Sequence, residues 1–307
     1  MGEIQVAHRS YSQMTSWLRC GNAYYLERVA KVPQRPSWWF VGGKAVHSAT
    51  ETFDRLVENK PYLLVAGEER TKHEEEIDWI WESAWENEYQ DTLTNTDVPV
   101  EEWRAGGRAT KAKPNKENGD WWKTAGREFL RNWVDFRITY PNWRIAELPD
   151  GRPGIEPEFN VWFGTVPVRG FIDRVFDVRG PGGEVSRVVV DLKTGARMPD
   201  TTQQTGMYAS MMELAYGAEH RPPLGCFWDA RKGDITVPEG LGSHSVENLT
   251  PMLEMFNRAV LDNIFIPHVG GNCNSCSVAK YCRAVSGELA DTVDPIETPT
   301  RKDHSNA

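Results

Sequence analysis

Two short apolar runs, each holding one acidic residue, most constrain what this chain can fold into. The first, GFIDRVF, begins at Gly170 and contains Asp173; the second, RVVVDLKTG, begins at Arg187 and contains Asp191. Both have the pattern of β-strands. Because a strand places residues i and i+2 on one face, Asp191 and Lys193 are expected to point into the same space. Buried carboxylates are costly unless they are paired or bind a metal, so the pattern predicts a metal and phosphate site.

Composition narrows the class of protein. A length of 307 residues and an apolar fraction of 39% are typical of one large or two modest domains with a sizeable core. The net charge of −9 argues against nucleic-acid binding by the whole surface, but leaves room for a local basic groove. No apolar run approaches the ~20 residues of a membrane span, and no signal segment is visible. We therefore expect a cytoplasmic protein with no membrane partner.

The rest of the chain alternates between helical and strand patterns. Strands are expected near residues 156–163, 166–177, 186–192, 224–229 and 234–237. Helices are expected at residues 10–29, 42–59, 68–92, 120–139, 201–216 and 246–264. We predict a single domain over residues 1–285, with a helical subdomain at 48–150 inserted before a core at 155–237. Residues 286–307 are predicted to be a disordered tail.

A basic loop lies inside the helical block. Residues 104–116 contain five Lys or Arg and no acid, and Gly and Pro favour a loop. Two interpretations stay open. The segment is either a solvated loop or one that contacts phosphates, with Lys123, Arg127 and Arg131 lining the same groove.

The cysteines form a pattern of their own. Cys273, Cys276 and Cys282 are spaced C-x2-C-x5-C, which lets three thiolates hold one metal centre. Cys20 is the best candidate for a fourth ligand, whereas Cys226 lies in an apolar run and is expected in the core. Both zinc and an iron–sulfur cluster accept four cysteines, so spacing does not decide between them. Either centre would join the N- and C-terminal segments as a structural staple.

Taken in order along the chain, these motifs resemble a known family. GFIDRVF, then VVVDLKTG, then Gln204 and Tyr208 as Q-x-x-x-Y resemble PD-(D/E)xK nucleases of the RecB-like branch. His47, after Gly42 and Gly43, is similar to the N-terminal histidine motif of that branch. The cysteines resemble the iron–sulfur members, which include AddB nuclease domains, CRISPR-associated exonucleases of the Cas-four type and phage-encoded relatives. The resemblance implies a restriction-endonuclease-like α/β core, with a central mixed sheet flanked by helices.

The resemblance also implies roles for the central residues. His47, Asp173 and Asp191 would bind Mg²⁺ or Mn²⁺, with the Leu192 carbonyl as a further ligand. Lys193 would contact the scissile phosphate or the attacking water. Independently of the family, carboxylate and imidazole ligands suit these cations, and a lysine adds positive charge where the transition state gains negative charge.

Further roles are implied around this centre. Gln204 and Tyr208 would hold substrate or support the site. Glu156 would be an auxiliary acid, with Glu158 as the rival for that role. The family's cluster ligands correspond to Cys20, Cys273, Cys276 and Cys282. That correspondence favours a [4Fe–4S] cluster over zinc.

The expected function is metal-dependent DNA exonuclease activity, on single-stranded DNA, in recombination, repair or replication. Two alternatives stay open: a catalytically silent DNA-binding or scaffold subunit, and a zinc-stapled endonuclease. No G-x-x-x-x-G-K-[ST] loop is present, so a helicase would be a separate partner. Recombination or CRISPR-adaptation proteins and a homo-oligomer are the other partners considered.

Overall fold

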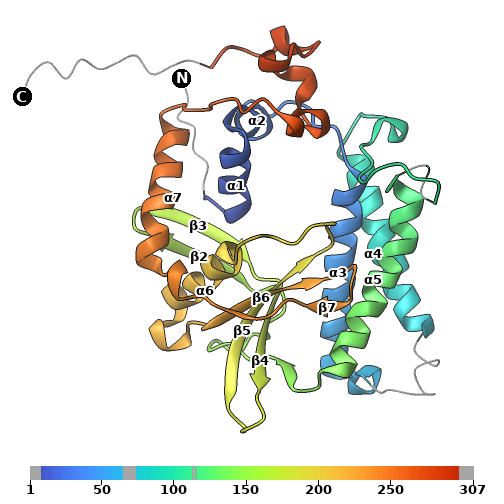
Figure 1. Ribbon diagram of the computed structural model, residues 1–307, viewed down its shortest axis with the longest axis vertical. Helices are drawn as coiled ribbons and strands as arrows, with labels where there is room; N and C mark the ends of the chain where they lie inside the picture. Colours follow the sequence, from blue (N-terminus) through green and yellow to red (C-terminus); the bar gives the residue numbers. More distant parts are fainter. Residues whose placement is uncertain (1–7, 65–73, 113, 115, 297–307) are drawn as a thin grey trace, which may run out of the picture. The chain divides into compact units, whose positions relative to one another are not determined.

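The chain is organised as two compact units. The computed structural model describes residues 8–64, 74–112, 114 and 116–296 (Figure 1). One unit takes its residues from Met1–Gln34, Asn160–Arg169 and Glu247–Ala307, and the other from Arg35–Phe159 and Gly170–Val246.

The larger unit is built on a mixed sheet. Its strands are β1 (Trp143–Ile145), β4 (Arg174–Arg179), β5 (Val185–Lys193), β6 (Leu224–Asp229), β7 (Asp234–Ile235) and β8 (Glu239–Gly240). The order is β1-β4-β5-β6-β7, with β8 also paired to β6. Only β5 and β6 run parallel. A parallel pair needs a crossover connection, which helix α6 (Gln203–Tyr216) provides.

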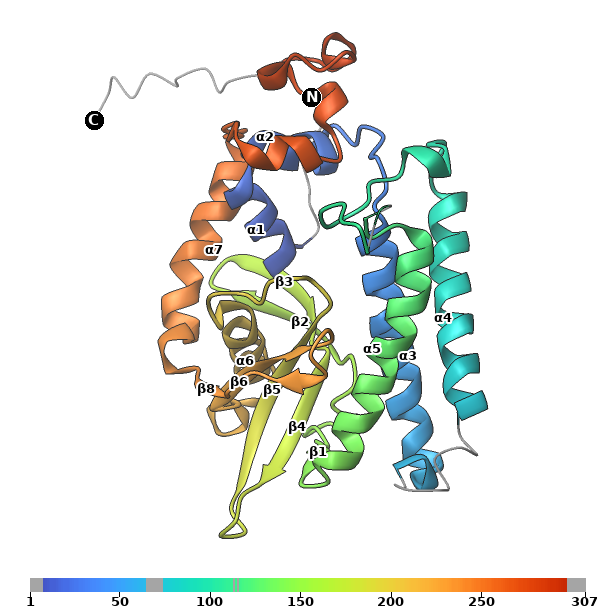
Figure 2. The ribbon, with the colours of Figure 1, turned by 45° about the vertical axis from the view of Figure 1, so that its right-hand side comes forward.

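Three long helices lie against one another beside this sheet. They are α3 (Trp38–Asn59), α4 (Glu74–Thr94) and α5 (Gly119–Thr139), and both ribbon views show them side by side (Figures 1 and 2). The helices predicted at 68–92 and 120–139 are confirmed by α4 and α5, although residues 68–73 lie outside the described ones. A mixed sheet flanked by helices confirms the expected α/β class.

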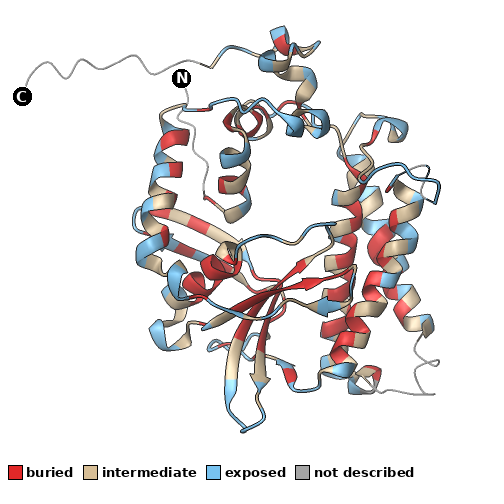
Figure 3. Ribbon diagram, in the orientation of Figure 1, coloured by how far each residue is buried: buried red, intermediate tan, exposed pale blue. Residues whose placement is uncertain are grey.

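The core of this unit joins the helices to the sheet. Strands β4, β5 and β6 are largely buried, and the inner faces of α3, α4 and α5 are buried with them (Figure 3). Residues 188–192 are all buried, as a central strand covered on both faces requires. Trp81, Trp122, Trp133 and Trp228 are among the largest fully buried side chains. Cys226 is fully buried on β6, which confirms its expected place in the core.

The smaller unit contains both terminal segments. Its main elements are α1 (Tyr11–Arg19), α2 (Gly21–Tyr24), the π-helix η1 (Tyr25–Val29) and α7 (Val246–Leu261). It also contains residues 160–169 of the hairpin formed by β2 (Glu158–Phe163) and β3 (Val166–Phe171). Arg9 ties the N-terminal segment to this hairpin, because its backbone N–H donates to the Pro167 carbonyl at 2.8 Å. Its buried guanidinium donates to Asn257 of α7 at 2.7 Å.

Short helices complete the described chain. They lie at Pro61–Leu64, Val100–Glu102, Ala218–His220, Gly242–His244, Gly271–Ser275, Ala279–Tyr281, Arg283–Val285 and Ala290–Thr292. Among the helices in the described ranges, none combines the length and apolar character needed to cross a membrane.

Two sequence-predicted elements are interrupted. The helix predicted at 10–29 breaks at Cys20, whose backbone is extended. After it, Gly21 packs so closely on another segment that a Cβ would lie 2.7 Å from the Ile266 nitrogen. The strand predicted at 166–177 ends at Phe171 and resumes at Arg174, because β3 pairs with β2 while β4 belongs to the larger sheet. The chain changes sheets at Ile172 and Asp173.

The predicted C-terminal tail is partly structured where it is described. Ala290, in the last short helix, is buried, and Val293 packs against a small apolar cluster. Apolar contacts therefore order the start of this segment. Residues 297–307 lie outside the described residues.

The contact between α4 and α5 depends on a glycine. A Cβ at Gly126 would lie 2.0 Å from the Trp81 ring, and Trp81 is held in place by a 2.8 Å bond from its indole N–H to the Lys123 carbonyl. We expect Gly126→Ala to lower the free energy of unfolding by about 1–3 kcal/mol, although alanine favours a helix. Urea denaturation measures the change. Gly242→Ala is the control, because a Cβ there meets nothing within 4 Å. An equal effect of both substitutions would contradict the proposed tight contact.

Candidate metal centre

Three possible metal ligands from separate parts of the larger unit converge. His47 lies on α3, Asp173 in the break between β3 and β4, and Glu156 just before β2. One ligand atom from each lies within 4.8 Å of the other two. His47 Nδ1 is 3.3 Å from Asp173 Oδ1, with the imidazole one-third exposed and the carboxylate nearly buried. An imidazole and two carboxylates form a donor set that suits Mg²⁺ or Mn²⁺.

The residues of this group have strongly shifted pKa values, because each titrates among neighbouring charges. Burial by itself would lower the pKa of His47, but neighbouring carboxylates, led by Asp173, outweigh that effect and raise it to about 9. Burial, reinforced by the charge of Asp173, raises the pKa of Glu156 to about 7. Burial also opposes ionisation of Asp173, yet His47 and the Leu192 N–H lower the pKa of that carboxyl. A divalent cation bound here would offset the crowded negative charge.

A second polar chain begins at the end of β5. Lys193 Nζ lies 2.5 Å from Asp191 Oδ2, which confirms that these side chains share a face. The ammonium also donates to Gln204 Oε1 at 2.8 Å, and Gln204 Nε2 donates to the Tyr208 hydroxyl at 3.0 Å. Burial raises the pKa of Tyr208 well above its usual value, and the charges of Asp191 and Asp173 act in the same direction. The four side chains form one connected line.

Asp191 is not one of the three residues of the compact group, although it lies near enough for its charge to interact with Asp173 and His47. Burial, and then the charge of Asp173, raises the pKa of Asp191 to about 6, while Lys193 opposes that rise. The two aspartates are linked through Leu192, whose N–H donates to Asp173 Oδ2 at 2.6 Å. The role that the sequence resemblance implied for the Leu192 carbonyl stays a prediction.

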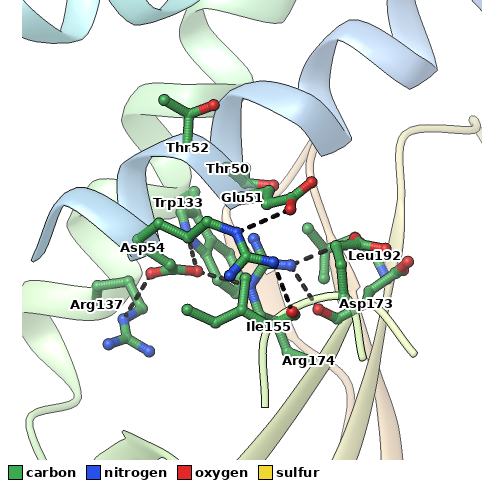
Figure 4. A network of polar contacts seen from close by, with 12 residues as sticks. Thr50, Glu51, Thr52, Asp54, Trp133, Arg137, Ile155, Asp173, Arg174 and Leu192 are labelled. Carbon is green, nitrogen blue, oxygen red and sulfur yellow. Dashed lines mark hydrogen bonds and ion pairs between the residues drawn. The ribbon is translucent and has the colours of Figure 1, made fainter. Parts of the chain in front are cut away.

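A buried network of polar side chains next to Asp173 was not predicted from the sequence (Figure 4). Asp54 of α3 accepts bonds at its Oδ2 from Arg174 Nε at 2.6 Å and from Trp133 Nε1 at 3.1 Å. Arg137 Nε lies 3.5 Å from Asp54 Oδ1. Arg174 is fully buried and also donates to the Asp173 carbonyl at 2.5 Å. The only sequence signal was an arginine next to Asp173 in GFIDRVF.

A second missed pair fixes the chain just after Lys193. Arg231 makes two 3.0 Å bonds to the carboxylate of Glu117, which is buried. Its Nε also donates to the Thr194 carbonyl at 2.8 Å. Because Glu117 closes the basic loop by pairing with Gly106, this pair connects the base of the loop to the end of β5.

Cations near the basic loop have protein partners. Arg127 forms a bidentate ion pair with Asp78 of α4, and Arg131 Nη2 lies 2.6 Å from Glu74 Oε2. Arg104 donates to the Arg35 carbonyl at 3.0 Å. Arg127 and Arg131 are therefore engaged with α4 carboxylates, although the sequence suggested that they line a groove. Residues 113 and 115 of the loop lie outside the described residues.

The four cysteines of the predicted staple all lie in the smaller unit. Cys20, Cys276 and Cys282 pack against one apolar cluster, formed by Ala23, Leu26, Val32 and Val278. The Cys20 sulfur accepts from the His268 N–H at 3.4 Å, and the Cys282 sulfur accepts from Asn22 Nδ2 at 3.1 Å. Burial raises the pKa of the Cys276 thiol, to which Cys20 and Cys282 also contribute. Three of the four cysteines therefore gather at one apolar cluster.

Comparison with known proteins assigns the family. The profile of the PD-(D/E)XK nuclease superfamily matches residues 8–283. The chain belongs to this superfamily. It is also 28% identical to the Gene 69 protein of Mycobacterium phage D29 over 305 residues, which cover 92% of this chain and 98% of that protein. The Gene 69 protein of Mycobacterium phage L5 is 28% identical over 302 residues, which cover 89% and 95%.

Membership in the PD-(D/E)XK superfamily indicates which chemistry the converging side chains could serve. These proteins are metal-dependent nucleases, and the group of His47, Glu156 and Asp173 could hold the divalent cation that such a nuclease uses. DNA is the substrate that the superfamily implies.

The structure favours Glu156 over Glu158 as the auxiliary acid, because Glu156 belongs to the compact group. We expect Glu156→Gln to weaken Mn²⁺ binding at least about tenfold, since a neutral amide is a poorer ligand for a hard cation. Titration calorimetry on metal-free protein measures the dissociation constant. Glu158→Gln, two residues along the chain, should stay within about twofold of wild type. The reverse ranking of the two variants would move the ligand to Glu158.

Proposed function

We propose that this protein is a divalent-metal-dependent deoxyribonuclease that degrades single-stranded DNA as an exonuclease. The observation that carries the proposal is the convergence of His47, Glu156 and Asp173 beside the Asp191–Lys193 ion pair. These groups come from α3, the segment before β2, the break before β4, and β5. A purely structural ion-pair network has no need to gather an imidazole and several carboxylates in this way.

Each of these residues would have its own role in phosphodiester hydrolysis. His47, Glu156 and Asp173 would hold Mg²⁺ or Mn²⁺, with Asp191 completing the acidic wall. When bound, such a cation supplies positive charge beside the phosphoryl oxygens and increases the acidity of water. Lys193 provides a fixed ammonium for a phosphate oxygen, and its bond to Gln204 keeps it aimed. Tyr208 in turn holds the Gln204 amide.

The finer points of the proposal come from motif order. The histidine, the two aspartates, the lysine and Q-x-x-x-Y follow the order of RecB-like exonucleases, which supports end-directed action on a single strand. A silent DNA-binding subunit is disfavoured, because it would not need Lys193 paired with a buried Asp191. We place the enzyme in the cytoplasm, in recombination, repair or replication, with any helicase as a separate partner.

We further propose that the four cysteines hold a [4Fe–4S] cluster. Cys20 lies between α1 and α2, while the other three follow α7, so a cluster would join the first and last segments of the smaller unit. N–H groups directed at sulfur, as at Cys20 and Cys282, suit cluster thiolates. A centre with four protein ligands leaves no open position for chemistry, so its role is structural.

Lys193 tests the hydrolytic assignment. We expect Lys193→Ala to slow the degradation of single-stranded DNA by about 10²–10³-fold with Mn²⁺ present, because one preorganised positive charge is lost from the transition state. The assay uses 5′- and 3′-end-labelled single- and double-stranded DNA. For wild type, short products from one labelled end of the single strand are expected.

Lys232→Ala is the matched control, because Lys232 is an exposed lysine of the same unit, paired with Asp229. It should leave the rate within about twofold of wild type, and both variants should keep the wild-type melting temperature. Full activity in Lys193→Ala would remove this residue from the site. Internal cleavage of wild-type substrate without shortening from an end would replace the exonuclease with an endonuclease.

Cys276 tests the cluster. Anaerobically purified wild-type protein is expected to be brown, and Cys276→Ser should lose iron and melt at a lower temperature, because the staple is opened. Iron and sulfide analysis and thermal unfolding measure both effects. Cys226→Ala is the control, because Cys226 is buried in the core of the larger unit and its replacement should leave the iron content unchanged. Colourless wild-type protein with one zinc per chain would make the centre a zinc site.

A further inference from the structure

Helix α3, which carries His47, also contacts the residues next to the other two proposed ligands, from a position two turns beyond His47. Asp54 and Arg55 lie seven and eight residues after His47, about 10 Å further along the helix axis. Each contacts the residue that neighbours one of the acidic ligands. Asp54 binds Arg174, which follows Asp173, and Arg55 binds Ile155, which precedes Glu156.

The contact on the Asp173 side is buried and charged. Arg174 and Asp54 are both almost completely inaccessible, and their side chains meet at 2.6 Å. The Arg174 guanidinium reaches back to the carbonyl of Asp173 at 2.5 Å and lies 3.4 Å from Glu156 Oε1. One guanidinium thus contacts the backbone of one ligand and the side chain of another. A buried ion pair of this kind cannot shift without exposing an uncompensated charge.

The contact on the Glu156 side is half-exposed. Arg55 Nη2 donates to the Ile155 carbonyl at 3.1 Å, while its Nε donates to Glu51 one turn earlier at 2.9 Å. Glu51 therefore braces the guanidinium. The next residue, Glu156, has a φ of 47°, a conformation that a glutamate adopts only when its surroundings hold it there.

The two contacts act on one short bridge. Ile155 and Arg174 pair across an isolated antiparallel bridge, and the Glu156 N–H donates to the Asp173 carbonyl at 3.1 Å. Asp54 and Arg55 thus hold opposite sides of the bridge that carries both carboxylates. Because the same helix carries His47, one rigid element sets the spacing of all three ligands.

We propose that Asp54, Arg55 and Arg174 are positioning residues that set the affinity of the centre for its divalent cation. This inference rests on the proposed function, in that His47, Glu156 and Asp173 are the ligands. None of the three residues needs to touch the metal or the DNA. They act through the Ile155 carbonyl, the Asp173 carbonyl and the Glu156 side chain.

Arg55 gives the sharpest test, because position and charge predict opposite results. Arg55→Gln removes a positive charge near a cation site, and Coulomb's law alone would then tighten metal binding. Loss of the bond to Ile155 frees a ligand held in an unfavourable backbone conformation, and this weakens binding. We expect the Mn²⁺ dissociation constant to rise by about 10-fold or more, as for other outer groups that orient metal ligands.

The experiment is titration calorimetry of metal-free full-length protein with Mn²⁺, with a thermal melt of each variant. Arg258→Gln is the matched control, because Arg258 of α7 forms the same kind of i,i+4 ion pair, with Asp262 just after that helix in the smaller unit. Arg258→Gln should bind Mn²⁺ as wild type does. DNA degradation by Arg55→Gln should return to within about twofold of wild type at saturating Mn²⁺, since the defect is in metal binding.

The outcomes separate this inference from the proposed function. Equal or tighter Mn²⁺ binding by Arg55→Gln, with normal binding by wild type, overturns the positioning role and leaves the nuclease assignment standing. Absence of Mn²⁺ binding by wild type overturns both. Arg55 is about half exposed, so the fold is expected to survive the substitution. If the melt shows that Arg55→Gln does not fold, Arg55→Lys replaces it, because lysine keeps the charge and one donor. The Mn²⁺ dissociation constant of Arg55→Lys must then lie closer to wild type than that of Arg174→Lys, which loses the paired donors of a buried guanidinium.

Discussion

The buried ion pair between Asp54 and Arg174 is the interaction on which the catalytic side of this protein depends. A single carboxylate faces the guanidinium groups of Arg174 and Arg137 and the indole of Trp133, all in the interior. Removing such charges from water is costly, and the cost is offset only when every partner is in place. The pair therefore locks helix α3 to strand β4 in one register. That register brings His47 and Asp173 together, so the geometry of the site depends on the Asp54–Arg174 pair.

Above this pair, the centre combines groups that repel one another. Burial and mutual repulsion raise the pKa values of Glu156 and Asp191, while neighbouring carboxylates, led by Asp173, raise the pKa of His47. Lys193 offsets one aspartate and is itself held by Gln204. A divalent cation at the proposed site would offset this repulsion between carboxylates. Glu156 also has a positive φ, which is unfavourable for a glutamate. The surrounding hydrogen bonds hold this proposed ligand in that conformation.

The two units divide the chemistry between them. Every residue of the proposed hydrolytic site lies in the larger unit, and the four cysteines of the proposed cluster lie in the smaller one. The residues that pack around Cys20, Cys276 and Cys282 are apolar, whereas those around His47 are charged. This separation suits a structural role for the cysteines and a chemical role for the acids. The PD-(D/E)XK profile and the phage Gene 69 proteins both match across the residues of the two units.

Local pattern was enough for part of this structure. The strand period alone predicted that Asp191 and Lys193 share a face, and the helical period predicted α4 and α5, because both depend on residues close in sequence. The break at Asp173 could not be predicted, since it arises where the chain passes from one sheet to another. Nor could the pairing of Asp54 with Arg174, which lie 120 residues apart in the chain. Sequence determined which chemical groups are available; the tertiary structure decided which of them meet, because a buried charge takes its partner from whatever the packing brings within reach.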